Sequence, residues 1–547
     1  MARRLPTLTD ENTYLLTGGA LIDGSGSRAI RMDVAINGGR IAGISSPGTA
    51  SASTVVDATG GVVCPGFIDI HTHSDLSLLG CPQSESKIRQ GVTTEVVGNC
   101  GGSAAPLLGA AIADVKNMAS SYGVDVDWVS FDEYLQRLSD VGTSVNVASL
   151  VGADTIRMGV LGLDDVEPDA EELERMKTMV SEAMAQGAYG LSSGLIYAPG
   201  CYASTEELIA LAEAIAPFAG IYASHIRGEG STLLKAVDEA IRIGREAAVR
   251  VQISHHKAIG PRNWGLVSES LKAIEDARRS GIDVAFDVYP YTASCTSLHA
   301  ILPPWVQDGG RKAILENISK EDVRQRIKDE FKDLLNTLWE NTVAEDGWDN
   351  IAVSGFKKAE NKRLEHMRMN QIAELRGIEP ADAAMDLLIE EGFDLMGVFH
   401  EISDDDVSRV ISHPLASVAS DGEVSASVGP CSGTAVHPRA FGTFPRAIRE
   451  YSLRKGLIPL EEMIRKMTSA PAERMGFADR GRLAEGMMAD IVVFDRERIR
   501  DMATFENPNQ YAEGITHVFV NGVLTICDGE HTGELAGIVL KKNASVS

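Results

Sequence analysis

Between about residue 170 and residue 290 the sequence alternates regularly between helical patterns and short apolar strands. The helical patterns cover 170–186, 205–218, 233–248 and 268–280, and the strand patterns that follow them cover 187–191, 221–225, 251–255 and 284–288. Short apolar runs between helices are typical of parallel strands that are buried on both faces. Because no glycine-rich phosphate loop opens a helix, this alternation favours a (β/α)₈ TIM-like barrel over a doubly wound open sheet.

The two ends of the chain differ from this central part, since both consist of short strands separated by glycine turns. We expect strands at 14–17, 34–37 and 40–44 near the beginning and at 490–495 and 517–523 near the end. Chain termini often lie close together, so these pieces should pair into one small β-sandwich domain. The predicted organisation is therefore an N-terminal part of the small domain at 1–64, a barrel at 65–475 and a C-terminal part at 476–547.

A charged section at about 312–370 interrupts the alternation and carries few strand signals. We interpret it as a helical insertion over the barrel mouth, either a lid or a solvated excursion without a functional part.

Composition limits the possible partners and location. The 77 acidic and 51 basic residues give a net charge of −26, which argues against nucleic acid or an anionic membrane as a partner. No segment approaches the length of a membrane-spanning helix, and residues 1–7 have no apolar run of the kind found in a secretory signal. The seven cysteines lack the spacing of a disulfide framework, so we expect reduced thiols and a cytoplasmic protein.

The segment 65–73 ends an apolar strand with His71 and His73. Residues two apart on a strand point to the same face, so both imidazoles should enter one cavity. Such a pair is half of a metal site, or alternatively two hydrogen-bonded core histidines.

Four further residues follow apolar strands elsewhere, namely Cys100, His225, His255 and Asp421. In a barrel of this type functional residues gather at the carboxyl ends of the strands. Thiolate, imidazole and carboxylate are zinc ligands, so the coincidence predicts a metal site, although each residue alone could be a buried or turn residue. His255 and His256 face opposite sides of a strand, and His255 is the expected ligand because it lies two positions after Ile253.

Several longer segments resemble the amidohydrolase superfamily and, within it, the N-acyl-D-amino-acid deacylase family. The matching segments are 65–73, 91–94, 98–101, 191–200, 222–227, 287–294, 437–439 and 504–508. The distinctive feature is a cysteine after the second strand. Many amidohydrolases instead use a modified lysine that lies further along the sequence. The resemblance implies zinc-dependent hydrolysis of the amide bond of a small-molecule N-acyl-D-amino acid.

The resemblance also implies roles for particular residues. It places a tightly held zinc on Cys100, His225 and His255, and a weaker second metal position near His71 and His73. Asp421 would be the catalytic carboxylate that takes a proton from metal-activated water. The substrate's α-carboxylate would be held by Tyr197, Lys257 and Arg439, with a further hydrogen bond from Ser294.

Two departures from the family pattern concern the barrel mouth: Ala153 stands where relatives often have histidine, and the segment 423–434 is longer and poorer in histidine. Both bear on substrate preference rather than on the metal ligands. Two other readings remain open: a cyclic-amide hydrolase of the dihydroorotase or hydantoinase type, and a non-catalytic scaffold. The first would require a bridging lysine where this chain has Cys100, and the intact Cys100, His225, His255 and Asp421 argue against the second.

Overall fold

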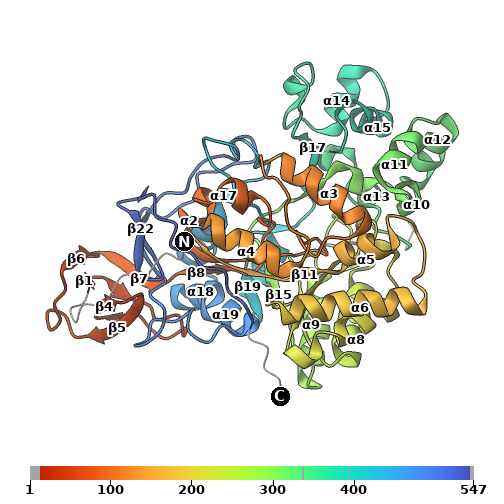
Figure 1. The fold of residues 1–547 in the computed structure, drawn as a ribbon. Helices are drawn as coiled ribbons and strands as arrows, with labels where there is room; N and C mark the ends of the chain where they lie inside the picture. The colour runs from red at the N-terminus through yellow and green to blue at the C-terminus, as the bar shows by residue number, and fades with distance from the viewer. Residues whose placement is uncertain (1–12, 335–337, 394, 543–547) are drawn as a thin grey trace.

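The structure is a computed structural model that describes residues 13–334, 338–393 and 395–542 (Figure 1). The expectation about a secretory signal concerned residues 1–7, which lie outside the described residues.

The centre of the molecule is a barrel of parallel strands. Its strands are β8 (Phe67–Asp69), β9 (Val92–Val97), β10 (Asn146–Ser149), β11 (Val151–Gly152), β12 (Gly190–Gly194), β13 (Ile221–His225), β14 (Arg250–Ile253), β15 (Val284–Val288) and β19 (Ala416–Val418). They form two sheets of order β10-β9-β8 and β11-β12-β13-β14-β15-β19, in which β10 and β11 are two parts of one strand interrupted at Leu150. A parallel bridge between Thr72 and Gly422 connects the extensions of the first and last strands, so the barrel closes at its mouth.

The helices between these strands agree with the sequence patterns, apart from a few boundaries. Three of the four expected helices are α6 (Ala170–Ala185), α8 (Leu233–Glu246) and α9 (Val267–Arg279). The fourth pattern divides into α7 (Thr205–Glu213) and a 3₁₀ turn that contains Pro217, because proline lacks the N–H that would continue the helix. The strand expected at 187–191 was placed too early, since β12 starts only at Gly190.

The small domain contains two sheets built from both ends of the chain. The first consists of β1 (Tyr14–Thr17), β4 (Asp33–Asn37), β5 (Arg40–Ser45) and β6 (Thr54–Asp57). The second consists of β2 (Ala20–Leu21), β3 (Ile30–Arg31), β7 (Gly61–Pro65), β20 (Ile491–Asp495), β21 (Ile515–Val520), β22 (Val523–Cys527) and β23 (Glu530–His531).

The two ends meet where β7 pairs antiparallel with β20, from Pro65 opposite Ile491 to Gly61 opposite Asp495. An apolar cluster that includes Leu16, Ile36, Val63 and Phe519 joins residues of both sheets. The predicted fold class, a barrel with a small β domain formed by both termini, is confirmed.

A long excursion separates β15 from β19 and has a hydrophobic core of its own. It contains an antiparallel sheet of β16 (Ser294–Ser297), β18 (Met396–Phe399) and β17 (Ile351–Ser354). Its helices are α10 (Pro304–Gln307), α11 (Gly310–Ile318), α12 (Glu321–Glu330), α13 (Thr342–Asp346), α14 (Met369–Arg376) and α15 (Pro380–Glu391), which form the green and cyan group in Figure 1. The section expected at 312–370 lies within this excursion, and 335–337 fall outside the described residues.

The expectation that all cysteines are reduced is wrong for two of them. Cys81 and Cys431, which are 350 residues apart in the sequence, form a disulfide. Local spacing could not reveal this pair, because the barrel brings together the loops after its first and last strands. Cys64, Cys100, Cys201, Cys295 and Cys527 are free. Among the described residues, no helix is both long and apolar enough to cross a membrane.

Candidate active site

A cavity of about 940 Å³ opens at the carboxyl ends of the barrel strands and extends against the excursion. Nine of the residues expected from the sequence line it: His73, Cys100, Tyr197, His225, His255, Lys257, Ser294, Asp421 and Arg439. The remaining one, His71, is fully buried beside them. The volume of the cavity lies near the upper end of the roughly 300–1,000 Å³ range of ligand pockets, so a small molecule fits inside the cavity.

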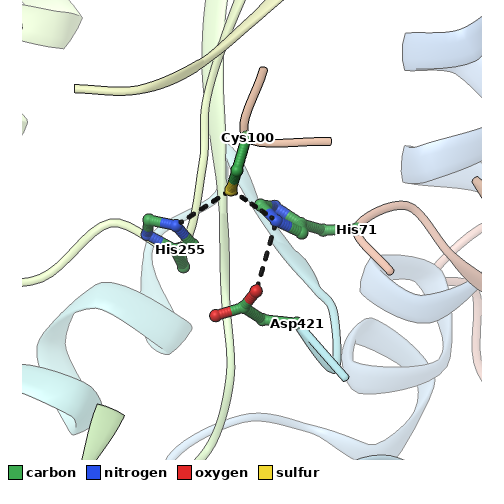
Figure 2. A group of neighbouring side chains, drawn as sticks. All are labelled: His71, Cys100, His255 and Asp421. Atoms are coloured by element: carbon green, nitrogen blue, oxygen red, sulfur yellow. Dashed lines mark hydrogen bonds and ion pairs between the residues drawn. The ribbon is translucent and has the colours of Figure 1, made fainter. Parts of the chain in front are cut away.

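Four side chains converge at the inner end of this cavity (Figure 2): His71, Cys100, His255 and Asp421. Their ligand atoms all lie within 4.8 Å of one another. The Cys100 Sγ lies 3.3 Å from His71 Nε2 and 3.6 Å from His255 Nε2, and His71 Nε2 lies 3.3 Å from Asp421 Oδ1.

His225 belongs to a second, overlapping group with Glu229 and His255. The His225 and His255 rings are 4.4 Å apart between centroids. Although His225 is buried, neither of its ring nitrogens has a hydrogen-bond partner among the described residues. An unpartnered buried imidazole beside a thiol, two further imidazoles and a carboxylate is a donor set that fits a metal ion.

The two candidate anions are favoured in their charged forms. Burial opposes ionisation of the Cys100 thiol, but the neighbouring His71 and His255 hold its pKa well below the usual range. Burial likewise opposes ionisation of Asp421, but the Arg439 guanidinium and the neighbouring His255 and His71 hold its pKa well below the usual range. Both groups can therefore supply negative charge to a cation at neutral pH.

Three of these residues have an unusual backbone conformation. Cys100, His255 and Asp421 have φ angles of 49°, 34° and 51°. Positive φ is uncommon for residues other than glycine and costs conformational energy, so it persists only where the surroundings enforce it. Each residue stands just beyond a strand, and the left-handed turn directs its side chain into the cavity.

Arg439 and Asp421 form a direct ion pair in which Arg439 Nη1 donates to Asp421 Oδ2 over 2.6 Å. Arg439 Nη2 also donates to the Cys295 carbonyl at 2.9 Å. Asp421 accepts a further contact from His73 Nε2 at 3.0 Å, and the His73 side chain is 38% exposed. Arg439 therefore lies within reach of both the candidate catalytic carboxylate and a molecule in the cavity.

The other expected substrate-binding residues also have partners. Lys257 Nζ donates to Glu229 Oε1 over 2.6 Å, and Ser294 Oγ donates to Glu401 Oε1. Thr296 Oγ1 donates to the Tyr197 hydroxyl over 3.0 Å.

Two carboxylates that the sequence reasoning did not assign support the histidines from behind. Glu229 Oε1 lies 3.1 Å from His255 Nδ1, and Asp287 Oδ1 lies 3.2 Å from His71 Nδ1. Such partners fix the ring orientation of a ligating histidine. The sequence could have indicated Asp287, because it is the penultimate residue of the strand expected at 284–288. Glu229 lies in the loop after His225, where no strand or helix pattern marks it. His256, which sequence reasoning set aside, points away from the group, and its Nε2 lies 2.9 Å from Ser270 Oγ.

Residues 54–526 match the amidohydrolase family model. The chain belongs to the amidohydrolase family. It is 37% identical over 536 residues to a D-aminoacylase of Alcaligenes xylosoxydans xylosoxydans, an alignment that covers 97% of this chain and 98% of the relative. The resemblance inferred from the sequence motifs is therefore confirmed.

Solved amidohydrolases agree with the structure over nearly its whole length. The N-acyl-D-glutamate deacylase of Bordetella bronchiseptica, solved with zinc and a phosphonate that mimics the tetrahedral intermediate, superposes with a TM-score of 0.80 at 32% identity, covering 97% of this chain and 100% of that one. A D-aminoacylase described with a binuclear centre, in which one metal activates and the second attenuates, gives a TM-score of 0.80 at 34% identity with the same coverage.

More distant solved structures share the fold alone. A D-hydantoinase superposes with a TM-score of 0.51 at 15% identity, covering 96% of this chain and 98% of its own. At this identity the likeness carries no argument about substrate.

Proposed function

We propose that this amidohydrolase removes the acyl group from N-acyl-D-amino acids by hydrolysis of the linear amide bond. The observation that carries the proposal is the group of His71, Cys100, His255 and Asp421, whose ligand atoms lie within 4.8 Å of one another in the barrel mouth. The full-length relatives named for D-aminoacylase and N-acyl-D-glutamate deacylase activity support it.

Cys100, His225 and His255 would hold one zinc ion tightly, and His71 with His73 would contribute to a second, weaker metal position. A zinc ion bound there supplies Lewis acidity, which polarises the amide carbonyl and lowers the pKa of water toward about 7. Two observations support Cys100 and His225 as ligands: the pKa of Cys100 is lowered, and the buried His225 ring has no hydrogen-bond partner among the described residues.

Asp421 would act as the general base and then as the general acid. Its carboxylate lies beside His71 and His73, and the lowered pKa keeps it deprotonated and ready to accept a proton from water. The same oxygen can return that proton to the departing amine, which makes the free D-amino acid a good leaving group.

Arg439, Lys257, Tyr197 and Ser294 would orient the amino acid portion. A guanidinium offers a bidentate fork to a carboxylate, and a lysine offers a point charge. Both cations are buried at the cavity wall, so their attraction for the α-carboxylate is screened less than at a free surface.

The decisive experiment measures amide hydrolysis and bound metal on the same purified sample. N-acetyl-D-methionine, N-acetyl-L-methionine and hydantoin should be compared as substrates, with zinc determined by elemental analysis. We expect turnover of the D isomer and at least one zinc per chain. Turnover of hydantoin without the linear amide would favour the cyclic-amide reading, and neither zinc nor hydrolysis would favour a scaffold.

A further inference from the structure

Lys87 is a fully buried lysine outside the cavity, in the short helix α2 (Glu85–Ile88) behind the loop that carries Asp421. Its Nζ donates to Ser420 Oγ at 2.6 Å, to Asp69 Oδ2 at 3.0 Å and to the Gly422 carbonyl at 3.0 Å. An ammonium group has three N–H donors, so these three acceptors use all of them.

Two of the three acceptors belong to the residues on either side of Asp421. Asp421 itself has a φ of 51°, which an aspartate adopts at a cost. Its N–H donates to the His71 carbonyl at 2.9 Å, while the Lys87 ammonium fixes the preceding side chain and the following carbonyl. The left-handed turn is thus held from both sides.

The same ammonium connects this turn to the strand that carries His71 and His73. Asp69, which accepts from Lys87 through Oδ2, also accepts from the Ser420 N–H through Oδ1 at 2.8 Å. The Gly422 carbonyl accepts from the His73 N–H at 3.1 Å. Lys87 and Asp69 therefore set the distance between the first-strand histidines and Asp421.

Burying an ammonium group in a protein core costs desolvation free energy that an apolar side chain would not. Removing such a charge from water costs several kcal/mol, and well-packed apolar residues often stabilise a fold as well or better. Lysine is almost never fully buried unless it is paired. Here Asp69 and Glu95 supply the opposite charge, and the two other acceptors, Ser420 and Gly422, flank Asp421.

We propose that Lys87 is a positioning residue that holds Asp421 in its working orientation through Ser420 and Gly422. The inference rests on the proposed role of Asp421 as the proton-transfer group. It predicts that loss of Lys87 lowers turnover by misplacing this carboxylate, while the zinc ligands and the carboxylate-binding cations stay in place.

A double-mutant cycle with Lys87→Met and Asp421→Asn tests this coupling. In the wild-type background Lys87→Met should lower kcat by about 10- to 100-fold, because displacements on the order of 1 Å have such effects, while KM changes less than about twofold. In the Asp421→Asn background the same change should alter kcat by less than about threefold. Zinc content should remain that of the wild type in each variant.

The matched control is Lys466→Met. Lys466 is also fully buried, and its Nζ donates to the carbonyls of His413 and Ala416. His413 precedes β19 and Ala416 begins it, so these contacts lie at the end of the strand opposite to Asp421. This control should change the melting temperature without changing kcat. An equal loss of kcat in both lysine variants would show that any buried lysine is needed, and would overturn the inference.

Full additivity of Lys87→Met with Asp421→Asn, or loss of zinc, would also overturn it. If Lys87→Met does not fold, Ser420→Ala tests the contact through which Lys87 acts by the same cycle. It removes the hydroxyl that accepts from Lys87 Nζ and from the Gly422 N–H, without removing a charge. Its loss of kcat should again disappear in the Asp421→Asn background. Absence of turnover in the wild-type enzyme would overturn the proposed function itself, which separates the two failures.

Discussion

Asp421→Asn is the most direct test of the proposed chemistry. Asparagine keeps the size of the side chain and can still accept from Arg439 Nη1, which lies 2.6 Å from the carboxylate in the structure. It cannot act as a base at neutral pH. General acid–base groups contribute about 10²- to 10⁴-fold, which corresponds to about 3–5 kcal/mol of activation free energy at about 1.36 kcal/mol per tenfold.

The same substitution weakens a buried ion pair, so its effect on stability must be measured separately. Removing one partner of a buried charge pair costs about 3–5 kcal/mol, a large part of a typical stability of about 5–15 kcal/mol. The retained amide oxygen should keep the loss below that range. Rates should therefore be compared well below the melting temperature of the variant.

The assay measures the free amine that is released when N-acetyl-D-methionine is hydrolysed. Zinc is determined on the same protein sample. Zinc content should stay unchanged, because the proposed ligands Cys100, His225 and His255 are all retained. A turnover number within a few fold of wild type, on a folded and zinc-loaded sample, would remove Asp421 from the mechanism. A pH profile adds a second check: because the pKa of Asp421 is lowered, protonation of this carboxylate should not reduce activity near neutral pH.

Four other substitutions test the remaining parts. Arg439→Ala should weaken binding and turnover of N-acyl amino acids far more than those of an N-acyl amine that lacks the carboxylate; equal losses would make Arg439 structural. Cys100→Ala should abolish zinc binding and activity, whereas His71→Ala should hurt less; the reverse order of zinc contents would contradict the assigned ligands. Cys81→Ser opens the disulfide to Cys431 and should lower the melting temperature, since native disulfides contribute about 2–5 kcal/mol; unchanged melting would show that the bridge does not form in solution.

The sequence could predict the barrel because its signal is local. The buried strands β13 and β15 appear as apolar runs with the observed boundaries, and α6 begins at the expected residue. Pairings between distant segments left no such signal. The Cys81–Cys431 disulfide and the pairing of β16 with β18 depend on loops that only the closed barrel brings together.

The same distinction applies to the site. Cys100, His225, His255 and Asp421 could be selected because each stands at the carboxyl end of a strand, where this fold collects functional groups. Glu229 and Lys87 could not be selected from the sequence. Glu229 contacts His255, which is remote in the sequence, and Lys87 contacts the irregular turn around Asp421. Their chemistry is visible only once the partner atoms are in place.

Arg439 can serve Asp421 and the substrate at the same time, because its guanidinium has five N–H donors and the structure engages one with Asp421 and one with the Cys295 carbonyl. Three donors remain for a carboxylate in the cavity. A bound carboxylate would offset part of the positive charge that lowers the pKa of Asp421, so the base should become stronger when the correct substrate arrives. We therefore expect an N-acyl amine without a carboxylate to show a lower kcat as well as a higher KM, measured on the wild-type enzyme at saturating substrate. An unchanged kcat would mean that Arg439 binds the substrate without tuning the base.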